Sequence, residues 1–182
     1  MKDLSLHILD LIQNSTAVNS TLINLDIIDS IKDNILSFRI KDNGKGMTKE
    51  FLAKVTDPYS TTRTTRKVGL GLPLIKMNAE NCGGGFKIES ELGIGTNLTF
   101  WFEHNNIDRP PMGDIAGVFV LTIAQNEDIR FIMSYKTDND IFTFDTDQVK
   151  ETLDGIPLNN NDIIKFLREM IEENIKEIGG NE

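Results

Sequence analysis

The sequence predicts an α/β protein, because segments with helical periodicity alternate with short strand-like runs. The helix-like segments in the first part of the chain are residues 3–19, a short one from residue 48 and a longer one from residue 69, and the strand-like runs are residues 21–28, 35–41, 86–91 and 97–103. Hydrophobic residues make up 39% of the 182 residues and charged residues 26%. That composition is typical of a soluble globular protein.

The first helix has an apolar face and a polar stripe. Asp3 is placed to cap it, and its apolar positions are Leu4, Ile8, Leu11 and Ile12. His7, Asp10 and Asn14 follow one another at intervals of three and four residues, so they share the other face. An amide oxygen is a suitable ligand for Mg²⁺, and a neighbouring carboxylate could orient or deprotonate an attacking water. The alternative is a solvated polar face, and we interpret His7 as a core-edge or solvated histidine.

A glycine-rich segment follows the strand-like run at residues 35–41 and begins with a carboxylate. It has the sequence Asp42-Asn43-Gly44-Lys45-Gly46-Met47, and Thr48 after it is a good N-cap for a short helix. Glycine lets a backbone approach a flat ligand closely, and a buried Asp42 could accept a hydrogen bond from an amino group such as that of adenine. The alternative is an ordinary turn.

The loop at residues 57–68 combines hydroxyl groups with three cations, and it runs into glycines that open a helix. The relevant residues are Thr61, Thr62, Arg63, Arg66 and Lys67, followed by Gly69, Leu70, Gly71 and Leu72. Backbone amides at a helix N-terminus form an anion site, and hydroxyls and cations are the groups that a triphosphate recruits. Pro73 suits the first turn of this helix, and the glycines at 83–85 suit its end.

A fourth motif, Gly93-Ile94-Gly95-Thr96, lies between the last two strand-like runs of this part of the chain. Its structural interpretation is a hairpin turn. Thr96 could also add a hydroxyl group to the side of the site that contains Asp42.

The segment from Asn105 to Gly113, with two adjacent prolines, is the best candidate for a domain boundary. Of the 19 basic and 28 acidic residues, 12 and 12 lie in residues 1–105, so the whole net charge of −9 falls in residues 106–182. We therefore predict one domain at 1–105 and an acidic α+β extension at 106–182. In the extension, strand-like runs cover 118–124, 130–135 and 141–144, and helix-like runs cover 148–153 and 162–178.

Composition also excludes several classes. No basic surface suits a nucleic-acid backbone, and no apolar run approaches the ~20 residues that span a bilayer. The start of the chain lacks a small-residue cleavage site, so it is not a signal peptide. The single cysteine, Cys82, excludes an internal disulfide framework and a cysteine-based zinc site. These features predict a cytoplasmic protein.

Taken together, the motifs resemble those of the GHKL family of ATP-binding domains, which includes histidine kinases, gyrases and mismatch-repair ATPases. LDLIQNS resembles its N box, DNGKGM its G1 box, GLGL its G2 box and GIGTNLTF its final G-T motif, and the matches cover residues 4–102. DPYSTT resembles the start of the family's ATP lid. The resemblance implies a two-layer α/β sandwich of the Bergerat type, with a mixed sheet covered on one face by helices and a small α+β extension at the C-terminus.

The resemblance also implies ATP and Mg²⁺ as ligands. Asn14 would bind Mg²⁺, Asp42 would bind the adenine amino group, and Thr96 would support it. Asp10 stands where many family ATPases have a glutamate as general base, with a side chain one methylene shorter, and is the candidate catalytic residue. The ATP-binding residues expected in full are Asn14, Asp42, Gly44, Gly46, Met47, Thr61, Thr62, Arg63, Lys67, Gly69, Leu70, Gly71, Leu72 and Thr96.

Three functions remain open at this point. The short threonine-rich and basic lid resembles that of anti-sigma-factor kinases, and the chain begins at the N-box helix. A protein kinase of signal transduction that acts in trans, on a histidine or serine of a separate protein partner, is therefore the preferred expectation. The alternatives are a nucleotide-dependent ATPase switch and a non-catalytic ATP-binding module whose acidic extension contacts a partner.

Overall fold

The computed structural model describes residues 3–55 and 71–180. Within them the chain forms six helices and six strands. The helices are α1 (Leu4–Thr16), α2 (Lys49–Leu52), α3 (Gly71–Asn81), α4 (Ile115–Gln125), α5 (Thr146–Leu153) and α6 (Asn161–Glu177). The strands are β1 (Leu22–Ser30), β2 (Ile35–Asp42), β3 (Gly85–Glu91), β4 (Gly95–Glu103), β5 (Arg130–Thr137) and β6 (Ile141–Asp145).

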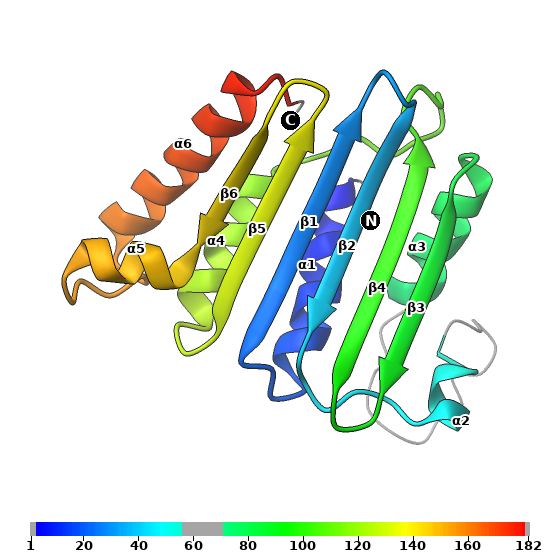
Figure 1. The fold of residues 1–182 in the computed structure, drawn as a ribbon, viewed down its shortest axis with the longest axis horizontal. Coiled ribbons are helices and arrows are strands. Elements are labelled where there is room, and N and C mark those ends of the chain that lie inside the picture. Colours follow the sequence, from blue (N-terminus) through cyan, green and yellow to red (C-terminus); the bar gives the residue numbers. More distant parts are fainter. Residues whose placement is uncertain (1–2, 56–70, 181–182) are drawn as a thin grey trace.

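The strands form one mixed sheet in the order β3-β4-β2-β1-β5-β6 (Figure 1). β1 pairs antiparallel with β2 and parallel with β5, and every other pairing is antiparallel. The register places Asp42, at the end of β2, opposite Ile23 on one side and Thr96 on the other. Two of the sequence motifs therefore meet at one end of the sheet.

The helices α1, α3 and α4 lie on one face of the sheet, and α6 packs on α4 (Figure 1). Alternate side chains of the central strands, such as Leu25, Phe38 and Phe100, are fully buried beneath these helices. The opposite face has no helix layer in the described part of the chain, and its residues include the ion pair between Arg39 and Asp26, at 2.6 Å. The predicted α/β fold, with a mixed sheet covered on one face, is confirmed.

Local capping follows the sequence closely. Asp3 accepts a hydrogen bond from the backbone amide of Leu6 at the start of α1, and Thr48 accepts one from Phe51 at the start of α2. After α3, Gly83 has a φ of 70°, a conformation that favours glycine at the end of a helix. These caps satisfy backbone groups that a helix end otherwise leaves without a partner.

One predicted element is wrong. The strand-like run at 118–124 belongs to α4, which is capped by Asp114, and the Asp114 carboxylate accepts a hydrogen bond from the Gly117 amide. The run is rich in β-branched and aromatic residues, which favours a strand. Most of α4 is nevertheless buried among α1, α6 and the sheet. A helix buried on nearly all sides has no polar stripe, so its period is invisible in the sequence.

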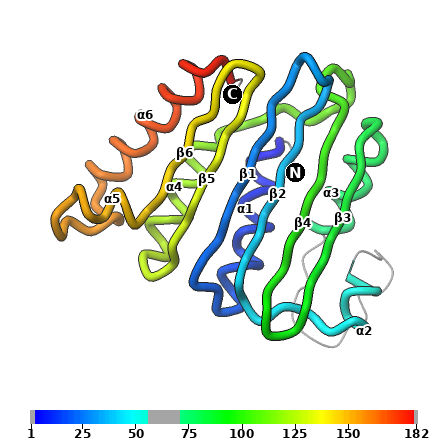
Figure 2. The backbone as a smooth tube through the Cα atoms, viewed as in Figure 1, coloured from blue at the N-terminus to red at the C-terminus, as the bar shows by residue number. Residues whose placement is uncertain are grey.

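The segment after residue 105 continues the same sheet. The chain leaves β4, crosses behind the sheet to α4 and returns as β5 beside β1 (Figure 2). Phe119, Phe131 and Phe144 pack edge-to-face, within the same core cluster as residues of β1 and β2. The predicted division at residue 105 requires residues 1–105 to fold without the part of this core that the later segment supplies, and a truncated chain tests that requirement.

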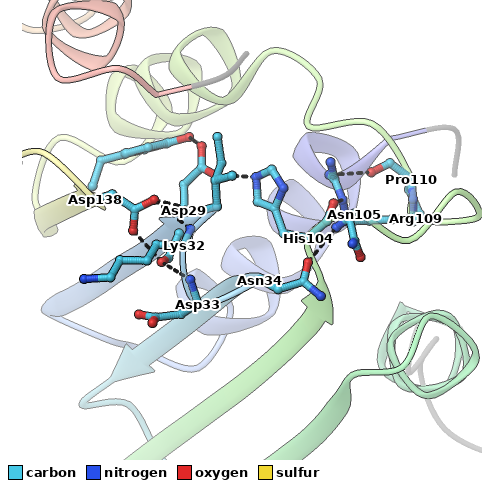
Figure 3. Close-up of polar contacts among 12 residues, drawn as sticks. Asp29, Lys32, Asp33, Asn34, His104, Asn105, Arg109, Pro110 and Asp138 are labelled. Carbon is cyan, nitrogen blue, oxygen red and sulfur yellow. Dashed lines mark hydrogen bonds and ion pairs between the residues drawn. The ribbon is translucent and has the colours of Figure 1, made fainter.

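A buried polar network also joins the two parts, at the end of the sheet far from Asp42. The Asp29 carboxylate, on β1, accepts a hydrogen bond from the Tyr135 hydroxyl at 2.9 Å, and His104 Nε2 lies 2.7 Å from its other oxygen. Figure 3 shows Asp29 facing His104. Nearby, Asp138 accepts from the Ser30 hydroxyl and from two amides of the β1–β2 turn. The network fixes β5 and the end of β4 to β1.

Candidate functional site

A cavity of about 420 Å³ opens at the end of the sheet where the glycine motifs meet. Its walls come from α1, β2, β3, β4, the segment after β2 and the start of α3. The lining residues are Leu11, Asn14, Ser15, Ala17, Val18, Ile40, Asp42, Lys45, Gly46, Met47, Thr48, Phe51, Val55, Leu72, Ile88, Leu92, Thr96 and Leu98. Most of them are apolar, and the volume lies in the range of small-molecule sites.

Asp42 supplies a buried carboxylate in this apolar cavity. Its side chain is 6% exposed, and its two oxygens accept hydrogen bonds from the Gly44 amide at 2.9 Å and the Ser15 hydroxyl at 2.8 Å. A carboxylate has about four acceptor positions. Two protein donors therefore leave acceptor capacity on Asp42, in a cavity where few other polar groups compete for a ligand.

Two glycines allow the backbone around Asp42 to pack tightly. Gly46 has a φ of 67°, and a Cβ there would lie 1.9 Å from the carbonyl oxygen of Glu91. Gly95 has a φ of 134°, and a Cβ there would lie 2.1 Å from the carbonyl oxygen of Asp42. The segment after β2 is thus held directly against the β3–β4 turn, and neither position accepts a larger residue without backbone movement.

A hydroxyl network holds the β3–β4 side of the cavity. Thr96 Oγ1 lies 2.9 Å from Ser90 Oγ, and Ser90 also donates to the Gly95 carbonyl and accepts from the Met47 amide. Thr96 and Met47 both line the cavity. The network therefore positions the glycine segment and Thr96 relative to each other, beside Asp42 in the sheet register.

Asn14 and Asp10 lie one turn apart on α1 but face different surroundings. Asn14 is exposed and lines the cavity. Asp10 is absent from the lining and faces the start of α3 instead, where a Cβ on Gly71 would lie 1.9 Å from its Oδ2. The predicted stripe is thus present, with its two functional candidates at the cavity and at the adjoining helix terminus.

The other predicted residues divide into three groups. Gly46, Met47, Leu72 and Thr96 line the cavity, whereas Gly44 packs on Val18 and Ser20, and Gly71 packs on Asp10. Thr61, Thr62, Arg63, Lys67, Gly69 and Leu70 lie outside the described residues. The structure therefore brings six of the predicted residues together at one cavity, and the loop that precedes α3 lies outside the described residues. The six are Asn14, Asp42, Gly46, Met47, Leu72 and Thr96.

Sequence reasoning missed Ser15, whose hydroxyl binds the Asp42 carboxylate. A signal was present, because Ser15 lies four residues after Leu11 on the apolar face of α1. A hydroxyl on a buried helix face needs a hydrogen-bond partner. Lys45 and Val18 were also missed, and here the local sequence gives no signal, since the backbone bond from Lys45 N to Val18 O joins segments far apart in the chain.

An α/β sheet with one helical layer, and an apolar cavity with a buried carboxylate beside glycine turns, defines a small-molecule-binding domain. Residues 2–106 match the family described as "Histidine kinase-, DNA gyrase B-, and HSP90-like ATPase". The match covers more than half of the chain, and the chain belongs to this family of ATP-binding domains.

The relatives found by sequence include proteins named as sensors or sensor histidine kinases. The chain is 35% identical over 97 residues to a sensor protein of Shewanella frigidimarina, with 52% of this chain and 15% of that protein covered. It is 32% identical over 74 residues to the sensor histidine kinase ZraS of Escherichia coli (41% and 16%), and 30% identical over 98 residues to the sensor histidine kinase YvrG of Bacillus subtilis (52% and 17%). The chain spans less than a fifth of the length of these relatives.

Solved structures share the fold. The ATPase domain of MutL from Aquifex aeolicus, complexed with ADP, has a TM-score of 0.53 at 16% identity, with 85% of this chain and 70% of that chain covered. The N-terminal domain of a DNA repair protein has a TM-score of 0.54 at 14% identity, with 79% and 52% covered. In the described part of the chain, no helix has both the length and the apolar character to cross a membrane.

Proposed function

We propose that this chain is a Mg-ATP-binding kinase module that transfers the γ-phosphoryl group in trans to a histidine or serine of a separate protein. The observation that best supports nucleotide binding is the buried Asp42 carboxylate in the apolar cavity, which can accept further hydrogen bonds beyond those from Gly44 and Ser15. The kinase activity is supported by relatives that are named sensor histidine kinases.

Adenine suits the chemistry of this end of the cavity. A flat apolar ring packs between the aliphatic side chains of Ile40, Ile88 and Leu98, all of which line the cavity. The exocyclic amino group donates to Asp42, while Thr96 and its Ser90 partner keep the adjoining strand in place. Removing the apolar faces of the ring from water favours binding, and a hydrogen bond to one charged acceptor orients the base.

Asn14 fits a role as the protein ligand of Mg²⁺. It is exposed on α1 and lines the cavity, and its amide oxygen is the kind of hard donor that Mg²⁺ accepts alongside phosphates and waters. When bound, Mg²⁺ would neutralise charge on the phosphate oxygens. Residues 61–72, with Thr61, Thr62, Arg63 and Lys67, are proposed to contact those phosphates.

Asp10 is proposed to act on the nucleophile. In the transfer step a bond forms between the nucleophile and the γ-phosphorus, and the bond to the β–γ bridging oxygen breaks. ADP leaves, and a proton passes to the Asp10 carboxylate: the hydroxyl proton of a serine nucleophile, or the proton on the non-attacking ring nitrogen of a histidine nucleophile. The position of Asp10 beside the first residue of α3 supports this role, because amides at a helix start favour phosphate oxygens.

The kinase proposal is tested with γ-labelled ATP. An extract of the source organism from which this protein has been depleted should contain a labelled polypeptide only after the wild-type chain and Mg²⁺ are added. The Asn14→Ala variant should give no label. Acid treatment then separates phosphohistidine, which is labile, from phosphoserine, which is stable.

An ATPase switch is the second candidate, and Asp10 is the observation that favours it, because a carboxylate can serve an attacking water as well as a side-chain nucleophile. Release of inorganic phosphate by the purified chain, without any labelled polypeptide in the extract, would replace the kinase proposal with this one. Tight nucleotide binding with neither product would instead indicate a non-catalytic module.

A further inference from the structure

Two buried polar atoms on α1 have no hydrogen-bond partner in the described part of the chain, and they lie one helical turn apart. They are Nδ1 of His7 and Oδ2 of Asp10. His7 is 1% exposed, so water does not reach its ring. The large majority of buried polar side-chain atoms in proteins have a partner, and a catalytic role is one of the recognised reasons for an exception. Two exceptions on one face of one helix therefore call for a common explanation.

The contact of His7 with α3 favours one tautomer of the imidazole ring. His7 Nε2 lies 3.4 Å from the Asn78 side-chain nitrogen, which is a hydrogen-bond donor. With the Asn78 amide in this orientation Nε2 accepts, and the proton of the neutral ring resides on Nδ1, the atom without a partner. Burial lowers the pKa of His7 below its ordinary value, which keeps the ring neutral, while the nearby carboxylates of Asp10 and Asp3 act in the opposite direction.

Asp10 provides an acceptor at the required spacing. His7 and Asp10 are three residues apart on the helix, so their Cβ atoms are about 5–6 Å apart and either side chain reaches the other by rotation. Asp10 Oδ2 is kept from water on the α3 side by Gly71, whose missing Cβ leaves room for that oxygen. Between α1 and α3, the Nδ1–H group of His7 thus lacks an acceptor, and Oδ2 of Asp10 lacks a donor.

We propose that His7 is a positioning residue for Asp10: its Nδ1–H donates to Oδ2 of the carboxylate and leaves Oδ1 directed at the nucleophile. The inference rests on the proposed function, in which Asp10 receives the nucleophile's proton. No proton is transferred to His7, which remains neutral throughout. Asn78 takes part indirectly, since its donation to Nε2 maintains the tautomer.

Nitrogen NMR of the imidazole rings decides whether the two side chains are coupled, whatever the turnover. The chain contains two histidines, so a His104→Gln variant assigns the signals of His7. We expect the Nδ1–H tautomer, and we expect the Asp10→Asn variant to shift the Nδ1 signal. Asp10→Asn should also lower the pKa of His7 further, because the negative charge of Asp10 raises it. A proton on Nε2, or a His7 signal and pKa unchanged by Asp10→Asn, overturns the proposal.

A double-mutant cycle then measures the consequence for catalysis. His7→Phe keeps an aromatic ring of similar size, and it should lower kcat about tenfold with little change in KM, as expected for the loss of one hydrogen bond made in the transition state. In an Asp10→Asn background the same change should have no further effect. Equal effects of His7→Phe in both backgrounds would show a merely structural role.

His104→Gln serves as the control for losing a histidine, since His104 directly follows β4 at the end of the sheet opposite Asp42. Its kcat should equal that of the wild type. If the wild-type chain turns over no ATP with any acceptor, the proposed function fails, and the NMR result still decides whether His7 holds the Asp10 carboxylate.

Discussion

Replacing Asp42 with asparagine tests the adenine end of the cavity with little disturbance of the fold. The Gly44 amide can only donate, so the side-chain oxygen that remains in the Asp42→Asn variant must face it. The new amide nitrogen then faces Ser15, whose hydroxyl can rotate to accept. The hydrogen bonds to Gly44 and Ser15 are thereby retained, whereas the adenine amino group loses its charged acceptor.

A hydrogen bond to a charged group contributes about 1.5–3 kcal/mol, which corresponds to a roughly 10- to 150-fold weaker affinity for ATP. Calorimetric titration with a non-hydrolysable ATP analogue measures this change, and thermal unfolding checks that the variant is folded. Asp26→Asn is the matched control, because Asp26 pairs with Arg39 on the open face of the sheet. Equal affinity of Asp42→Asn and the wild type would refute the assignment of the cavity as the adenine site.

Three further predictions concern the rest of the molecule. Deleting residues 106–182 removes β5, which pairs along β1, and should leave the remainder insoluble or without the near-ultraviolet circular dichroism of a folded protein. A folded truncated chain that binds nucleotide would instead support two independent domains. Tyr135→Phe removes the hydroxyl that donates to buried Asp29, and it should lower the unfolding free energy measured in urea by about 1.5–3 kcal/mol. ATP affinity should be unchanged, and an unchanged unfolding free energy would contradict the role of the network. The pKa of Asp138 is held below its ordinary value, first by the Ser30 hydroxyl, so its stabilising effect should be present at pH 7 and lost as the pH falls through the folded-state pKa. Asp138→Asn should therefore destabilise the protein at pH 7 and progressively less as the pH falls through that pKa, and an effect of Asp138→Asn on unfolding free energy that does not change with pH would contradict this.

The caps, turns and amphipathic helices could be predicted from the sequence, because each is decided by a few neighbouring residues. Asp3 and Thr48 cap the helices as expected, and the spacing of Leu4, Ile8 and Leu11 places α1 with its buried face toward the sheet. The glycine motif after β2 was also recognisable, since Asp42 and Gly46 stand in a short segment whose chemistry is local.

The remainder depends on contacts between distant parts of the chain. The helical state of α4 is determined by burial among α1, α6 and the sheet, which outweighs the strand preference of residues 118–124. The pairing of β1 with β5 joins strands that six other described elements separate along the chain, and it leaves no local signature. Asp29 likewise has no motif around it, although Tyr135 and His104 both contact it.

The central claim is that this chain binds Mg-ATP in the cavity between α1 and the glycine segment. Calorimetric titration of the full chain with the non-hydrolysable analogue, with and without Mg²⁺ and repeated on Asn14→Ala, tests it most directly. We expect one site per chain, tighter in Mg²⁺, with the Mg²⁺ dependence reduced in Asn14→Ala because that variant lacks the amide oxygen at the cavity. An absence of binding in every condition would contradict the claim, and equal Mg²⁺ dependence in both proteins would remove Asn14 from the metal site.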